Sequence, residues 1–307
     1  MRYTLEYPSE LPTAPDDFLE PDVIRDVAAR AEAAGFSAIA LSEHPAPSVK
    51  WRLGGGHDTL DPIAALSFMA AVTTDIKLMT NLYVLPFRNP YLSAKSLGSL
   101  DILSAGRLIA GVGAGYLRSE FAALGVDVAD RAQLLDEALA ALTSIWTDPE
   151  TPVSGKGFTA TSPVWLQPPV QRPHPPIWIG GNTAAAIRRV VQYGSGWMPI
   201  IAPAGMASAI GTAAVENADQ FGAVARRLRD ALADAGRDPA SVDVQVICPF
   251  IDLDDDSSLR QAQDVLGELA GHGANWAVAH VEAPTPKAAL DYLDAFGEAV
   301  IAGALVR

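Results

Sequence analysis

The chain has 307 residues, of which 49% are hydrophobic and 19% are charged, and its formal net charge at pH 7 is −14. This composition is ordinary for a globular enzyme, whereas the acidic balance argues against a nucleic-acid-binding protein, which would present a basic face. The single cysteine, Cys248, excludes an internal disulfide and a cysteine-cluster metal site.

The sequence contains no candidate for a membrane span or a signal peptide. No apolar run reaches the 18 residues that a transmembrane helix requires. The first six residues, Met1 to Glu6, lack the apolar core of a signal peptide. We therefore expect a cytoplasmic protein that does not associate with membranes.

The first half of the chain alternates short apolar strands with helices. Strands are expected at Tyr3–Tyr7, Ala38–Leu41, Ile76–Asn81 and Leu108–Val112. Two of these runs are continuously apolar, as in strands that are buried on both faces of a parallel sheet. Helices are expected after Asp22, after Asp61, over Pro90–Leu103, briefly over Tyr116–Leu124 and over Arg131–Trp146. Aspartate or asparagine before the first turn marks several of these helix starts.

The second half repeats the alternation after an interruption. Residues 148–175 are rich in proline and glycine, and we expect them to cross the surface without forming a domain boundary. Strands are then expected at Ile177–Ile179, Trp197–Met198, Val242–Ile251 and Trp276–Val281. Helices are expected over Thr183–Tyr193, Asn217–Ala235, Leu259–Leu269 and from Pro286 onward.

Eight strands alternating with eight helices indicate a parallel sheet with right-handed crossovers. In a chain of this length they favour an α/β fold of the (β/α)8 barrel type, formed by residues 1–307 as one domain. Insertions would lie in the loops at the C-terminal face, at 45–58, 148–175 and 199–215. The alternative fold is an open doubly wound sheet.

In a barrel the chemistry lies at the C-terminal ends of the strands. The residues expected there carry little charge, and they are Glu43, His44, Asn81 to Leu85, Gly113 to Tyr116, Gly180 to Thr183 and His280. They include no paired aspartates, no metal-ligand spacing and no nucleophile-elbow serine, which argues against hydrolysis and predicts no metal site. Such a set suits an organic cofactor that supplies the chemistry itself.

Two glycine-rich segments follow predicted strands. Gly113 and Gly115 alternate with small residues, which lets a flat ligand lie against bare backbone. Gly180 and Gly181 precede a helix capped by Asn182 or Thr183, where N–H groups and the helix dipole favour a phosphate. Both segments are also consistent with tight turns that serve packing alone.

Several segments in order resemble the luciferase-like monooxygenase superfamily, and most of all its F420-dependent oxidoreductase branch. They are the "AGF" of residues 34–36 leading to Ser42–His44, then residues 85–90, 100–108, 111–117, 173–181 and 194–197. The similarity extends from about residue 20 to residue 200. Over the last hundred residues only a compatible strand–helix pattern is present.

The resemblance implies a (β/α)8 barrel that binds coenzyme F420, an 8-hydroxy-5-deazaflavin, or alternatively FMN. It implies cofactor contacts at Asn81, Leu82, Tyr83, Gly113, Ala114, Gly115, Gly180, Gly181, Asn182 and Thr183, the last four at the phosphate. It also implies a non-prolyl cis peptide bulge at Leu82–Tyr83, behind the ring. A small-molecule substrate and a homodimer are further implications.

The resemblance places His44 beside the reactive edge of the ring, where a histidine suits proton transfer near neutral pH. Glu43, which stands where the family usually has aspartate, is expected to orient His44. Tyr116 is the third candidate catalytic residue. It stands where sugar-phosphate dehydrogenases of the family carry glutamate, which argues against that substrate class.

Three functions follow. The first is hydride transfer between a deazaflavin and a small organic substrate. The second is an FMN-dependent monooxygenase. The third, suggested by the few ionisable residues, is a barrel that binds a cofactor without turnover.

Overall fold

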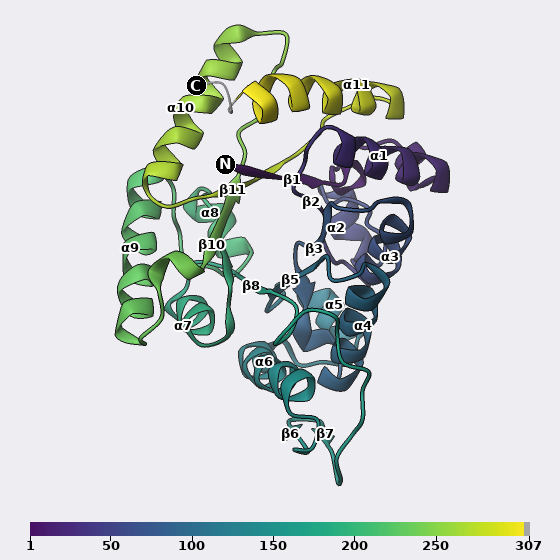
Figure 1. The fold of residues 1–307 in the computed structure, drawn as a ribbon, viewed down its shortest axis with the longest axis vertical. Coiled ribbons are helices and arrows are strands. Elements are labelled where there is room, and N and C mark those ends of the chain that lie inside the picture. Colours follow the sequence, from purple (N-terminus) through teal and green to yellow (C-terminus); the bar gives the residue numbers. More distant parts are fainter. Residues whose placement is uncertain (304–307) are drawn as a thin grey trace.

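Eight parallel strands close into a barrel in the computed structural model, which describes residues 1–303 (Figure 1). In order around the barrel they are β3 (Lys77–Thr80), β2 (Ala38–Leu41), β1 (Arg2–Glu6), β11 (Trp276–Ala279), β10 (Asp243–Ile247), β9 (Gly196–Met198), β8 (Ile177–Gly180) and β5 (Leu108–Gly113). Pairing of β3 with β5, with Leu78 opposite Leu108, closes the ring. The predicted (β/α)8 barrel is confirmed, because an open sheet would leave these two edges unpaired.

Eight helices surround the strands. They are α1 (Pro21–Ala33), α3 (Pro62–Val72), α4 (Pro90–Leu103), α6 (Arg131–Thr147), α7 (Ala184–Tyr193), α9 (Ala218–Asp234), α10 (Asp256–Gly271) and α11 (Pro286–Phe296). Figure 1 shows α3 and α4 on one side of the barrel, α9 and α10 on the other, and α11 across the top. Side chains cap many of the helix starts, as at Asp61 for α3 and Asn217 for α9.

Shorter elements lie in the connections. They are η1 (Pro8–Glu10), α2 (Val49–Leu53), β4 (Tyr83–Val84), α5 (Arg118–Ala123) and α8 (Ala204–Ala209). The expected surface excursion at 148–175 contains a small hairpin of β6 (Ser154–Gly155) and β7 (Phe158–Thr159), which projects at the bottom of Figure 1. The predicted strand at 242–251 is too long: β10 ends at Ile247, just before Pro249, which has no N–H for a sheet.

The core has two layers because strand side chains alternate between the two faces of the barrel wall. The outward residues of the strands pack against the helices. The inward residues fill the barrel, and they are Ala38, Ala40, Met79, Ile109, Trp178, Met198 and Trp276. The ring of Trp178 packs on the backbone of Gly196, and a Cβ on Gly196 would lie 2.3 Å from that ring. The barrel is therefore filled in its middle, and ligands can enter only at its ends.

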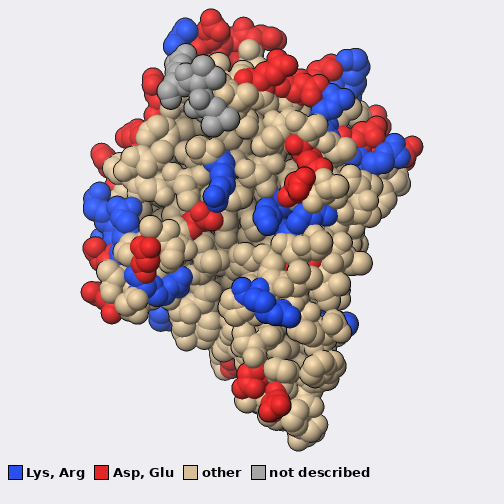
Figure 2. Space-filling model, in the orientation of Figure 1, with Lys and Arg blue, Asp and Glu red and all other residues tan. Residues whose placement is uncertain are grey.

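Charged side chains are interspersed over the face in Figure 2, with Lys and Arg scattered among Asp and Glu. None of the helices within residues 1–303 is both long and apolar enough to span a membrane.

Candidate functional site

The C-terminal mouth of the barrel is polar where β1, β3 and β11 end. Glu6, at the end of β1, accepts a hydrogen bond from Asn81 Nδ2 at 2.8 Å. His280 follows β11, and its Nδ1 lies 2.7 Å from Glu6 Oε2. Burial lowers the pKa of His280, but the contact with Glu6 and the nearby carboxylates outweigh burial and raise it. Asn81 is therefore at the mouth, as expected, and Glu6 joins it to His280.

A second carboxylate, Glu10, lies just below this surface. Its side chain, which η1 carries, accepts hydrogen bonds from Thr59 Oγ1 at 2.6 Å and from Ser42 N at 3.0 Å. Burial, together with the charge of Glu6, raises the pKa of Glu10 to about 7, although the hydrogen bonds from Ser42 and Thr59 lower it. Sequence reasoning missed both glutamates. The strand alternation that places Thr4 inside the barrel could have indicated Glu6.

His44 lies at the end of β2 with its side chain nearly buried, 9% exposed. Its Nδ1 is 3.3 Å from Oε2 of Glu120, a residue of α5 that is itself buried. The other oxygen of Glu120 accepts a hydrogen bond from Ala46 N. The histidine is thus fixed by a carboxylate from the segment after β5, which leaves Nε2 as its free ring nitrogen.

The prediction that Glu43 orients His44 is wrong. Strand alternation turns these neighbouring side chains to opposite sides. Glu43 accepts a hydrogen bond from Val84 N at 2.6 Å and forms an ion pair with Arg88. Burial raises the pKa of Glu43, partly offset by Arg88. Glu43 therefore ties the segment after β3 to the end of β2 and does not face the mouth.

Three aromatic side chains surround His44. The ring centroid of Trp51, from α2, lies 4.4 Å from that of His44, and His57 and Tyr116 lie at 5.3 and 6.0 Å. Burial raises the pKa of Tyr116 above its usual range. Tyr116 and His44 are therefore brought together, as predicted. The rings shield His44 from water on these sides.

The chain after β3 contains the non-prolyl cis peptide bond, but it joins Asn81 to Leu82 and not Leu82 to Tyr83. Leu82 packs on the residues that fill the barrel. Tyr83 resumes sheet pairing in β4, opposite Val112, so its side chain turns outward. It is fully buried in the outer core, with its ring under the Arg88 guanidinium. The side chain of Tyr83 is therefore not available to the cofactor, and a contact through its backbone stays a prediction.

The glycines after β5 and β8 have different roles. A Cβ on Gly113 would lie 2.8 Å from Leu82 Cδ1, and one on Gly180 would lie 2.3 Å from the same atom. The Leu82 side chain therefore packs directly on the backbone of both glycines, over the residues that fill the barrel. Gly115 has φ +74° and packs on Val84, so packing explains this glycine. Ala114 is half-buried between Gly113 and Gly115.

The turn after β8 confirms Thr183 as the N-cap of α7, because its side chain accepts from Ala186 N. Asn182 is bound to the next loop: its Nδ2 donates to Ile200 O and Ala213 O, and its Oδ1 accepts from Ile200 N. Its backbone N–H donates to Thr212 Oγ1 at 2.8 Å, and its predicted contact with phosphate stays a prediction.

Gly181, with φ +104°, allows the reversal of the chain into α7. The N–H groups of the first turn, at Ala184 and Ala185, have no partner within the helix. Within residues 1–303, no three His, Cys, Asp or Glu side chains are grouped to hold a metal ion.

The family model for "Luciferase-like monooxygenase" matches residues 6–303. An FMNH2-dependent dimethylsulfone monooxygenase of Pseudomonas putida is 29% identical over 180 residues, which are 57% of this chain and 47% of that protein. The chain spans about half the length of the curated relatives it matches.

Two solved structures share the fold. The monooxygenase RslO1 from Streptomyces bottropensis has a TM-score of 0.81 and 19% identity, covering 99% of this chain and 100% of its own. The coenzyme F420-dependent tetrahydromethanopterin reductase of Methanopyrus kandleri has a TM-score of 0.71 and 15% identity, covering 98% and 99%.

Proposed function

Because the chain belongs to the luciferase-like monooxygenase family, we propose that it is an F420-dependent oxidoreductase acting on a small organic substrate. When bound, a deazaflavin accepts or donates a hydride. The observation that carries the proposal is the His44–Glu120 pair, nearly buried at the barrel mouth. A catalytic site needs such a positioned proton carrier, whereas a purely cofactor-binding barrel does not.

The residues at the mouth fit a flat ring with a phosphate. Leu82, which is partly exposed and packs on Gly113 and Gly180, offers an apolar side chain to the ring. Thr183 and the first turn of α7 offer backbone N–H groups to an anion. Both features suit coenzyme F420 and FMN equally in shape and charge.

The chain's own residues have three roles in this proposal. His44 holds or moves a proton at Nε2 while Glu120 fixes its Nδ1. Trp51 and Tyr116 exclude water from His44, which strengthens electrostatic interactions there. Leu82 supports the ring from the side of the barrel interior.

FMN-dependent monooxygenation is the second candidate. The Pseudomonas putida relative, named as FMNH2-dependent, supports this alternative. Deazaflavins transfer hydride only, whereas reduced FMN also activates oxygen, so the identity of the cofactor decides between the two reactions.

Parallel fluorescence titrations of cofactor-free protein with coenzyme F420 and with FMN test the proposal. We expect coenzyme F420 to bind more tightly. Tight binding of FMN alone would replace hydride transfer with monooxygenation and make oxygen uptake the next assay. If neither binds below about 100 μM, roughly −5.5 kcal/mol, the assignment of the cofactor is wrong.

We also propose that the protein forms a homodimer through the outer faces of α3 and α4, which lie side by side. These faces expose Phe68, Leu92 and Leu103, which are 41%, 62% and 65% exposed. The only acidic residue in either helix, Asp101, is buried. The chain has a net charge of −14, so two copies repel each other over most of their surface. The outer faces of these two helices carry no acidic side chain and avoid this repulsion.

The variant Phe68→Glu is expected to shift the protein from dimer to monomer, because it places a charge in an apolar contact. Light scattering coupled to size-exclusion chromatography measures the mass. Trp165→Glu is the control and should stay dimeric, because Trp165 lies in the 148–175 excursion and is 76% exposed. A wild-type protein of monomer mass would contradict the proposal.

A further inference from the structure

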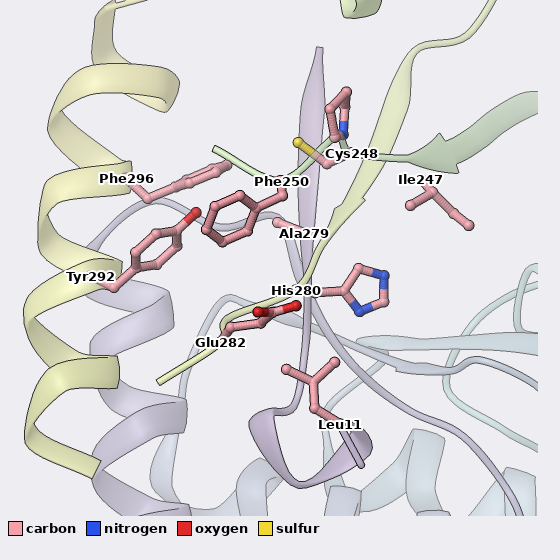
Figure 3. Close-up of a pocket in the computed structure, with 10 residues that line it drawn as sticks. Leu11, Ile247, Cys248, Phe250, Ala279, His280, Glu282, Tyr292 and Phe296 are labelled. Carbon is pink, nitrogen blue, oxygen red and sulfur yellow. The ribbon is translucent and has the colours of Figure 1, made fainter. Parts of the chain in front are cut away.

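A cavity of about 400 Å³ opens beside the polar half of the barrel mouth, between the ends of β10 and β11 and helix α11 (Figure 3). Its size lies in the range of small-molecule pockets. Figure 3 shows the rings of Phe250, Tyr292 and Phe296 gathered on the side of α11, with Leu11 below. The cavity is thus formed by four separate segments of the chain.

The wall of the cavity is largely apolar and is open to solvent. Phe250 is 63% exposed and Ile247 is 41% exposed. Apolar side chains that are exposed together along the rim of a cavity indicate a surface that a ligand covers. Ile247 ends β10 next to the strand that leads to His280, so this apolar surface reaches the barrel mouth.

Among the described residues, two titratable groups besides Cys248 and Tyr292 line the cavity, namely His280 and Glu282. Cys248 and Tyr292 are neutral, since burial raises the pKa of both. His280 is paired with Glu6, and no Lys or Arg of residues 1–303 lines the wall. The pair has no net charge when His280 is protonated. A carboxylate or phosphate in the cavity would face Glu282, and the only cation among the described lining residues would be the His280 imidazolium, whose charge Glu6 already balances.

His280 supplies the directional contact. Glu6 Oε2 lies 2.7 Å from its Nδ1, and Glu6 accepts a hydrogen bond from Asn81. The ring is 32% exposed, and its Nε2 is the nitrogen left for a ligand. A fixed donor at the end of an apolar pocket orients a substrate that has one polar end.

We propose that this cavity holds the apolar body of an uncharged organic substrate, and that His280 Nε2 donates a hydrogen bond to its carbonyl or hydroxyl oxygen. The identification of the bound molecule as a substrate rests on the proposed function, whereas its binding in this cavity does not. The cavity borders the mouth at His280, so the oxygen-bearing end of the molecule would lie at the mouth.

Three probes of equal chain length test the proposal: 2-octanone, octanoate and octylammonium. Calorimetric titrations use the protein with and without bound cofactor. We expect 2-octanone to bind at least 10-fold more tightly than octanoate and octylammonium. Equal or tighter binding of either ion would overturn the uncharged class, and no binding of 2-octanone in either state would overturn the cavity as its site.

Two variants locate the bound ketone. Phe250→Ala and His280→Ala should each weaken 2-octanone at least 3-fold, and Phe250→Ala should leave cofactor affinity unchanged, whereas Trp165→Ala should leave both unchanged. Because Phe250 is largely exposed, its substitution does not disturb the core. Unaltered ketone binding in both variants would place the ligand elsewhere. Ketone binding without any cofactor binding would contradict the proposed function while supporting this inference.

Discussion

Replacing His44 by alanine should lower turnover by about 100-fold or more, the usual contribution of a positioned general acid or base. Cofactor affinity should change by less than about threefold, since the histidine acts on the moving proton and adds little to ground-state binding. The physical basis is the fixed ring: Glu120 lies 3.3 Å from Nδ1 and Trp51 packs on its face. Steady-state turnover and fluorescence titration of the same variant measure both quantities.

Two further variants separate chemistry from folding. Glu120→Gln keeps the shape of the side chain but removes its charge, so kcat should fall and its pH profile should change while KM stays similar. His174→Ala is the matched control, since it removes a histidine outside the candidate site. His174 lies in the 148–175 excursion, where its ring packs on that of Trp146. Full activity of the His44 variant would exclude its proposed role, and the absence of turnover in wild type with any substrate would favour the barrel that only binds cofactor.

The variant Gly111→Ala should destabilise the barrel by about 3 kcal/mol or more, at the upper end of overpacking effects. A Cβ at this position would lie 2.0 Å from the backbone oxygen of Thr80 and 3.2 Å from Met198 Sδ. The backbone of β3 cannot move away, since Thr80 Oγ1 donates to Gly111 O and the pairing of β3 with β5 closes the barrel. Urea or thermal unfolding followed by circular dichroism measures the change.

Gly267→Ala makes the same chemical change on the surface of α10, where a Cβ would meet nothing within 4 Å. It should raise stability by up to about 1 kcal/mol, because alanine favours the helix and restricts the unfolded chain. Equal unfolding midpoints for the two variants would contradict the close contact of Gly111 with the backbone of β3.

The local sequence determined the fold of this protein. Apolar runs of four to six residues, as at Ala38–Leu41 and Leu108–Gly113, are fully buried strands, and their regular alternation with helices admits few arrangements besides a closed barrel. The helix cap at Thr183 and the turn glycines were predictable for the same reason, since their causes lie within a few residues.

Only the tertiary structure decided which charged groups meet. Glu120 reaches His44 across 76 positions of sequence, and Glu6 reaches Asn81 across 75, distances over which no local pattern operates. Where a strand ends, a shift of one residue turns a side chain to the opposite face. For this reason the side chains of Glu43 and Tyr83, next to His44 and Leu82, point into the outer core. The order of the strands around the barrel, set by packing of the whole chain, brought the remaining groups together.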